Sequence, residues 1–157
     1  MVSVLFVCLG NICRSPMAEA VFRQKVEHAG LSDKVTIDSA GTGHWHIGDG
    51  AHAGTMKILN ENEVDSTNLI ARQVKEQDLY DYDLVIVMDE KNEADVKKLR
   101  KIEHEVEISK LLDYKVDRSD KNVPDPYFTD NFEEVYELID ECCDALLADV
   151  RNRFLQQ

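Results

Sequence analysis

The chain has 157 residues, of which 43% are hydrophobic and 31% are charged, so it is long enough to bury a core and does not resemble a disordered or fibrous sequence. The 18 Lys and Arg residues against 31 Asp and Glu give a formal net charge of −13, which repels nucleic-acid phosphates and anionic membrane surfaces. We therefore expect a single domain over residues 1–157, with no nucleic-acid partner and no membrane insertion.

The cysteines indicate a reducing compartment. They lie at positions 8, 13, 142 and 143, too few for a small disulfide scaffold and too poorly spaced for a zinc site. The apolar run from Val4 to Leu9 is short, and the first basic residue, Arg14, follows it, so neither a signal peptide nor a membrane span is predicted. We expect a cytoplasmic protein in which each cysteine is either a buried hydrophobe or a reactive thiol.

The first predicted element is a strand, and a helix follows it closely. Residues 2–7 form a continuous β-branched and apolar run that is typical of a buried strand. Apolar residues then recur at helical spacing over residues 17–29. We expect this helix to begin at about Ser15, which can cap it, with Pro16 in the first helical position.

Strands and helices alternate along the rest of the chain. Strands are predicted over residues 35–39 and 83–88, with a weaker one over 106–111. Apolar spacing predicts helices around residues 56–64 and 94–102, and a long amphipathic helix from Phe132 to Val150. This alternation predicts an α/β fold of three layers, with helices on both faces of a parallel sheet. Ligands of such folds bind beyond the carboxyl ends of the strands, where Cys8 follows the first one.

The loop from Cys8 to Ser15, called the 8–15 loop below, combines a thiol, a guanidinium and a helix start. Successive backbone N–H groups in such a turn, together with the helix N-terminus, bind an oxyanion. Gly10 and Asn11 are residue types that accept positive φ, and Arg14 can grip two phosphate oxygens with its planar fork. We expect a phosphate-binding loop formed by Leu9, Gly10, Asn11, Ile12, Cys13, Arg14 and Ser15.

Cys8 has two interpretations, a packed hydrophobe or a nucleophile. A helix N-terminus and an adjacent cation favour the thiolate, and Ser15 can donate a further hydrogen bond, so the neighbours of Cys8 favour the nucleophile. The motif of a Walker-type nucleotide loop is absent. Cys13 stays open between simple packing and a redox role in which it traps an oxidised Cys8 as a disulfide.

The motif CLGNICRSP resembles the signature of the low-molecular-weight protein tyrosine phosphatases, and the resemblance continues through SAGTGHW, IARQ, MDEKN, VPDPYF and FEEVYELIDECC. It implies a four-stranded parallel sheet with a phosphate-binding loop after the first strand, no metal or other cofactor, and a cysteinyl-phosphate intermediate. It also implies that tyrosine-phosphorylated proteins are the substrates and inorganic phosphate a product. His44, His46 and His52 lie in a predicted loop without a tight metal-ligand pattern.

The same resemblance assigns the remaining site residues. Asp125 matches the family's general acid, which protonates the leaving oxygen and then activates water, and the prolines on either side restrict its backbone. Trp45, Tyr127 and Phe128 are similar to the aromatic walls of the family's substrate pocket.

Three departures from the family pattern are visible. Phe128 replaces the commoner second tyrosine and leaves Tyr127 as the candidate phosphorylation site. The segment His52-Ala53-Gly54 replaces a common Asp-x-Arg, which puts partner-protein contacts in doubt. Leu69 stands where some relatives carry a histidine, which changes the support around the 8–15 loop, although Asn11 with Ser39 can still brace it.

Three competing functions remain. A protein arginine phosphatase is the nearest, but that branch carries Thr where this chain has Ile12, and the apolar Ile12 favours an aromatic ring in the pocket. Arsenate reductases use two further cysteines in the middle of the chain, whereas none lies between residues 14 and 141. A non-catalytic phosphate-binding regulator has no need for Asp125. We expect a monomer that at most associates weakly with itself.

Overall fold

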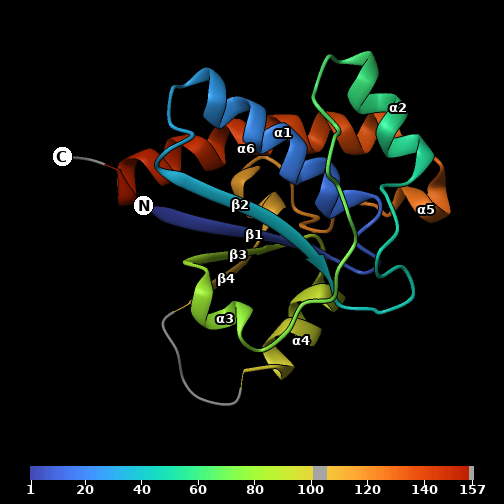
Figure 1. Ribbon diagram of the computed structural model, residues 1–157, viewed down its shortest axis with the longest axis horizontal. Helices are drawn as coiled ribbons and strands as arrows, with labels where there is room; N and C mark the ends of the chain where they lie inside the picture. The colour runs from blue at the N-terminus through green and yellow to red at the C-terminus, as the bar shows by residue number, and fades with distance from the viewer. Residues whose placement is uncertain (101–105, 156–157) are drawn as a thin grey trace.

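The structure is a computed structural model that describes residues 1–100 and 106–155, arranged as a sheet with helices on both faces (Figure 1). The strands are β1 (Val2–Cys8), β2 (Val35–Gly41), β3 (Leu84–Val87) and β4 (Glu107–Lys110). The α-helices are α1 (Arg14–His28), α2 (Ala53–Glu61), α3 (Asp78–Asp81), α4 (Glu90–Lys98), α5 (Pro126–Thr129) and α6 (Phe132–Phe154), and a 3-10 turn, η1, covers Leu111–Tyr114.

The sheet places the end of β1 at its centre. Within the described residues, four parallel strands pair in the order β2-β1-β3-β4. The α/β class and the four-stranded parallel sheet predicted above are thus confirmed. Because β1 is hydrogen-bonded on both sides, its last residue, Cys8, is fixed in register opposite Gly41 of β2.

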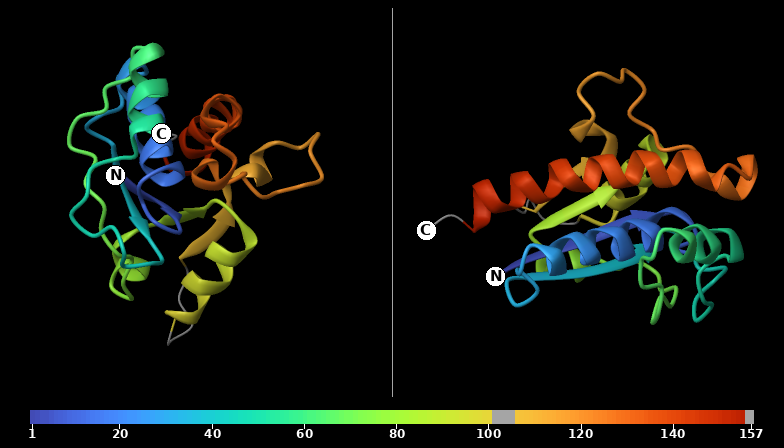
Figure 2. Two further views of the ribbon diagram at one scale, coloured as in Figure 1. Left: turned by 90° about the vertical axis from the view of Figure 1, so that its right-hand side faces the viewer. Right: turned by 90° about the horizontal axis from the view of Figure 1, so that it is seen from above.

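Side chains of β1 alternate between two cores. Val4, Phe6 and Cys8 belong to a cluster completed by α1 and α6, whereas Leu5 and Val7 belong to another that includes residues of α3, β3 and α4. Figures 1 and 2 show α1, α2 and α6 on one side of the sheet and α3 and α4 on the other. Burial on both faces explains why the strand sequence is continuously apolar.

Most predicted elements are present with shifted ends. α2 begins and ends three residues earlier than the apolar spacing predicts, so the buried Val64 lies beyond it. β2 continues two residues past Ser39, and α6 continues past Val150 to Phe154. α4 begins at Glu90, and the predicted end of its pattern, Ile102, lies outside the described residues. The short elements α3, α5 and η1 have four residues each, too few for apolar periodicity to reveal.

The predicted cap of α1 is wrong. The helix begins at Arg14, with Cys13 as its N-cap residue and no side-chain hydrogen bond at that position. Ser15 lies inside the first turn, and its hydroxyl is engaged by Cys8 and Asn11 rather than by the helix. Pro16 is therefore the third helical residue, where its missing N–H also costs nothing, because the first four N–H groups of a helix have no partner within it.

Two further observations concern the helices. Cys142 and Cys143 are residues of α6 whose side chains are buried in the core, as their place in the apolar pattern of this helix predicts. No helix within residues 1–100 and 106–155 combines the length and the apolar character needed to cross a bilayer.

Replacing Phe6 by Ala should lower the free energy of unfolding by about 3–5 kcal/mol, as is typical for a fully buried ring. Phe6 packs edge to face on Phe22 of α1, with ring centroids 5.7 Å apart. Urea titration followed by far-UV circular dichroism measures the change. Phe154→Ala is the control, because Phe154 is exposed at the end of α6 and should cost less than about 1 kcal/mol. Equal losses would contradict the assignment of the core.

Candidate active site

Three carbonyl groups of the 8–15 loop accept hydrogen bonds from segments outside the loop. The N–H groups of Thr42 and Gly43 donate to the carbonyls of Cys8 and Leu9 at 2.9 and 2.8 Å, and the N–H of His52 donates to that of Ile12 at 2.8 Å. In a trans peptide the N–H points opposite to the C=O. The N–H groups of the residues that follow these carbonyls are therefore turned inward, as an oxyanion site requires.

Asn11 makes the turn of the loop and braces it. Its φ of 56° is left-handed, as predicted. Its side-chain amide donates to Ser15 Oγ at 2.8 Å and to Ser39 Oγ at 2.9 Å, and its Oδ1 accepts from the N–H of Arg72 at 3.0 Å. The predicted brace of Asn11 and Ser39 is thus present. Every hydrogen-bonding atom of the buried amide group has a partner, which makes the loop rigid.

Gly10 differs from the prediction, because it does not adopt a positive φ. Gly10 matters to the loop because it has no side chain that would crowd its neighbours. A Cβ at this position would lie 3.2 Å from Cδ2 of His46, which leans over the loop. Gly10 therefore lets His46 approach the site.

The sulfur of Cys8 receives hydrogen bonds from two directions. Ser15 Oγ lies 2.9 Å from Cys8 Sγ, and the N–H of Asn11 donates to the sulfur at 3.3 Å. Ser15 Oγ accepts from the Asn11 amide, which leaves its own proton for donation. Two acceptors lie within reach of that proton, the sulfur at 2.9 Å and the carbonyl of Ala40 at the longer distance of 3.4 Å. Both donors stabilise a thiolate.

Arg14 is buried beside this sulfur and held by three groups. Its Nη1 donates to Asp89 Oδ2 at 2.7 Å and to the carbonyl of Val123 at 2.9 Å, and its Nη2 lies 3.4 Å from Asp125 Oδ2. Burial alone would lower the pKa of Arg14, but the adjacent Cys8, Asp125 and Asp89 outweigh it and raise that pKa. The cation is therefore permanent.

Asp125 is fixed at the start of α5. It is the N-cap residue of that helix, and its Oδ1 accepts from the N–H of Tyr127 at 3.1 Å. Its backbone is extended between Pro124 and Pro126, as predicted from the two prolines. The carboxylate thus has one oxygen used by the cap and the other directed toward Arg14.

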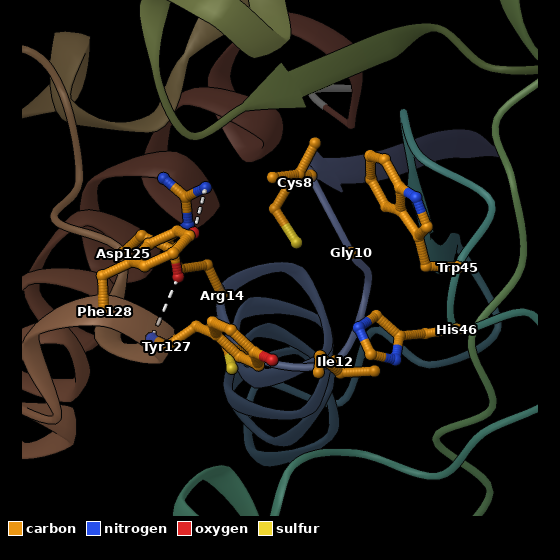
Figure 3. A pocket seen from close by; sticks show the side chains of 11 residues that line it. Cys8, Gly10, Ile12, Arg14, Trp45, His46, Asp125, Tyr127 and Phe128 are labelled. Atoms are coloured by element: carbon orange, nitrogen blue, oxygen red, sulfur yellow. Dashed lines mark hydrogen bonds and ion pairs between the residues drawn. The ribbon is translucent and has the colours of Figure 1, made fainter.

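A cavity of about 350 Å³ joins these groups (Figure 3). The sulfur of Cys8 points into it, with Tyr127 and Phe128 on one side and Trp45 and His46 on the other. The three predicted aromatic walls are all strongly exposed to solvent, as the entrance of a pocket for a protein side chain requires. The residues that line the cavity are Cys8, Leu9, Gly10, Ile12, Cys13, Arg14, Trp45, His46, Asp125, Tyr127 and Phe128.

Two predicted loop residues are not part of the lining. Asn11 and Ser15 are buried members of the loop, and their side chains stabilise it through hydrogen bonds. Sequence reasoning missed Asp89, which lies in the MDEKN motif at the carboxyl end of β3, the edge where a ligand is expected. It also missed the pocket position of His46, although this residue adjoins Trp45.

The loop histidines serve separate contacts. His46 Nδ1 lies 3.2 Å from Asp49 Oδ2, His52 accepts from the N–H of Gly54, and the ring of His44 lies 5.4 Å from that of Trp45. Across the parts of the chain that the structure describes, no three His, Cys, Asp or Glu side chains gather as metal ligands.

Comparison with known proteins identifies the family. The sequence model of the family "Low molecular weight phosphotyrosine protein phosphatase" matches residues 3–156. The chain belongs to this family. Three features fit that membership: the fold, the cysteine and arginine on the loop after the first strand, and the aspartate between two prolines.

Individual relatives of this phosphatase align over nearly their whole length. The low molecular weight protein-tyrosine-phosphatase YfkJ of Bacillus subtilis is 50% identical over 152 residues, 97% of each chain. The crystal structure of YfkJ has a TM-score of 0.95 at 49% identity and covers 98% of this chain and 97% of that one. PtpA of Staphylococcus saprophyticus is 41% identical, covering 94% of this chain and 92% of that protein. An arginine phosphatase of Drosophila has a TM-score of 0.88 at 30% identity, covering 94% and 97%.

Cys13 lies on the same loop as Cys8 but in a different environment. It packs with Ile12 and Ala71 beside Phe132, and neither cysteine forms a disulfide. Burial, followed by the charges of Cys8 and Asp125, raises the pKa of Cys13 to about 12. Cys13 is therefore a neutral thiol near pH 8, and its pairing with an oxidised Cys8 stays a prediction.

Iodoacetate at pH 8 should alkylate this phosphatase once, at Cys8. The thiolate is the reacting form, and Cys13, with a pKa of about 12, is protonated at that pH. Peptide mass spectrometry identifies the modified residue. Cys8→Ser should abolish the labelling, whereas Cys13→Ser should leave it unchanged, and rapid labelling of Cys13 in the native protein would contradict the assignment.

Proposed function

We propose that this protein-tyrosine phosphatase hydrolyses phosphotyrosine in proteins through a cysteinyl-phosphate at Cys8. The observation that carries the proposal is the convergence of three groups on one cavity: the sulfur of Cys8, the guanidinium of Arg14 and the carboxylate of Asp125. A nucleophile, a cation for the phosphoryl oxygens and an acid are the groups that this chemistry needs.

In the first step, the thiolate of Cys8 attacks phosphorus, so that an S–P bond forms as the P–O bond to the tyrosine breaks. The inward N–H groups of the 8–15 loop and the Arg14 fork bind the phosphoryl oxygens. These donors are fixed before the substrate arrives, because the loop carbonyls and the Asn11 amide are already hydrogen-bonded. The loop can therefore stabilise the charge on the phosphoryl oxygens with little rearrangement of its own donors.

Asp125 then completes both chemical steps. Its carboxylic acid form gives a proton to the phenolate that leaves, and the resulting carboxylate accepts a proton from the water that attacks the phosphocysteine, which releases inorganic phosphate and restores the thiolate. Its place in the lining of the cavity that Cys8 also lines supports this role. Asp125 thus returns to its starting form, because the proton that it donates in the first step is recovered from water in the second.

The pocket walls favour an aromatic substrate. Trp45, Tyr127 and Phe128 present rings to the cavity, and Ile12 presents an alkyl side chain, so a phenyl ring exchanges water for apolar contact on several sides. A phosphoarginine would bring a guanidinium into the same surroundings. Resemblance to the Drosophila arginine phosphatase keeps that substrate as the alternative, and a non-catalytic phosphate-binding role leaves Asp125 unexplained.

We also propose a cytosolic enzyme that acts as a monomer. The four cysteines are buried and unpaired, which suits a reducing compartment, and the reaction requires a reduced Cys8. The exposed rings at the pocket entrance must stay uncovered to admit a phosphoprotein, so any self-association through them competes with the substrate.

Asp125→Asn should lower kcat by about 10²–10⁴-fold for phosphotyrosine peptides, the usual range for loss of a general acid. The loss should shrink for aryl phosphates whose phenols are strongly acidic, because such leaving groups depart without a proton. Steady-state rates across a series of phenols measure this dependence. Asp130→Asn in the same segment is the control and should leave kcat unchanged, and losses equal across all phenols would reject the acid role.

The wild-type enzyme should hydrolyse phosphotyrosine peptides at least about tenfold faster than phosphoarginine peptides, because discrimination by an apolar pocket is commonly of this size. Ile12→Thr should narrow the ratio, since it replaces part of the apolar wall by a hydroxyl, whereas Ile12→Val should preserve it. Phosphate release from matched peptides gives kcat/KM for each. A wild-type preference for phosphoarginine would replace the proposed substrate with the alternative.

A further inference from the structure

His52 lies at a junction between the 8–15 loop and helix α2. Its backbone N–H donates to the carbonyl of Ile12 at 2.8 Å. Its ring Nδ1 accepts from the N–H of Gly54 at 2.9 Å, so His52 is the N-cap of α2. A ring nitrogen that accepts carries no proton, so in the neutral imidazole the proton is on Nε2. The side chain therefore has a fixed orientation.

The ring of His52 also links two aromatic residues. It stacks on Phe132 with centroids 5.1 Å apart and an interplanar angle of 24°, and it meets Tyr127 at 6.0 Å and 76°. The edge-to-face geometry with Tyr127 is a favourable one for aromatic pairs. His52 does not itself line the cavity, whereas Tyr127 does. The imidazole thus contacts the pocket wall from outside the pocket.

Gly54 makes this arrangement possible. A Cβ at position 54 would lie 2.4 Å from the Phe132 ring, so any side chain there would displace the ring on which His52 stacks. Two of the positions where the chain departs from the family pattern, His52 and Gly54, are therefore parts of one packing arrangement.

We propose that His52 is a positioning residue that holds Tyr127 as a wall for the aryl group of the substrate. Tyr127 is more than half exposed, and its other ring contacts are with His46 and Phe128, which are themselves at the pocket rim. The α2 cap and the stack on Phe132 anchor His52 to the protein interior. Fixing Tyr127 in advance reduces the ordering cost of substrate binding. This inference rests on the proposed function.

Two substitutions separate the ring of His52 from its cap. His52→Asn keeps an acceptor for the Gly54 N–H but removes the ring, so the KM for an aryl phosphate should rise about three- to tenfold, the size expected for one aromatic contact, with kcat changed less than about twofold. His52→Phe keeps a ring but removes the acceptor, so it should restore KM to within about twofold of the wild type and lower Tm by about 3 °C through loss of the cap. Initial rates and thermal melts are measured on the same preparations.

Inorganic phosphate supplies the internal control. Phosphate binds the 8–15 loop without reaching Tyr127, so its competitive inhibition constant should be equal in both variants and the wild type, which also shows that each variant retains a folded loop. Lys57→Ala, an exposed change on α2, should alter neither KM nor Tm. A KM that rises equally in both variants, that stays unchanged in His52→Asn, or that follows Tm would overturn the positioning role. Absence of wild-type turnover would instead contradict the proposed function.

Discussion

The guanidinium of Arg14 is only 2% exposed, and a buried cation without partners costs several kcal/mol. Its partners come from separate parts of the chain: Asp89 at the start of α4, the carbonyl of Val123 and Asp125. The segment that carries Val123 is itself tied to the sheet, because the N–H of Val123 donates to the carbonyl of Met88 after β3. The contacts that satisfy the Arg14 cation are therefore the same ones that place Asp125 near Cys8.

A second buried charge supports the loop from behind. Ser39, which accepts from Asn11, donates to Glu19 Oε1 at 2.6 Å, and Glu19 Oε2 accepts from Arg23 at 2.7 Å. The chain of contacts thus begins at a partly exposed ion pair and ends at the turn of the loop. Leu69 is buried in the core, so the position where some relatives carry a histidine is apolar here. Support for the loop comes through Ser39 and Glu19 instead.

Much of this architecture follows from local patterns in the sequence. The apolar run of β1, the spacing of α1 and the residue types of the 8–15 loop predict a strand, a helix and an anion loop, because each signal is contained in a few adjacent residues. Asp125 is different, since a Pro-Asp-Pro segment alone is consistent with any turn, and only the family motif indicated an acid.

The features that escaped prediction depend on contacts across the fold. The pairing of Asp89 with Arg14 joins residues 75 positions apart, and no periodicity reports such a contact. Ser15 does not cap α1 as its residue type predicts, because its hydroxyl forms hydrogen bonds with Cys8 and Asn11. Likewise, the need for glycine at position 54 is explained by the Phe132 ring, which lies beside it in the fold but 78 positions away in the sequence.

Trp45 is the single tryptophan of the chain, and it forms part of the pocket wall. Its indole is 65% exposed and has the ring of His44 beside it. Intrinsic tryptophan fluorescence of the native protein therefore originates from one place, the entrance to the active site. Occupancy of the pocket by an aromatic ligand changes the solvent around that indole, which gives an optical signal of binding that requires neither turnover nor an added label.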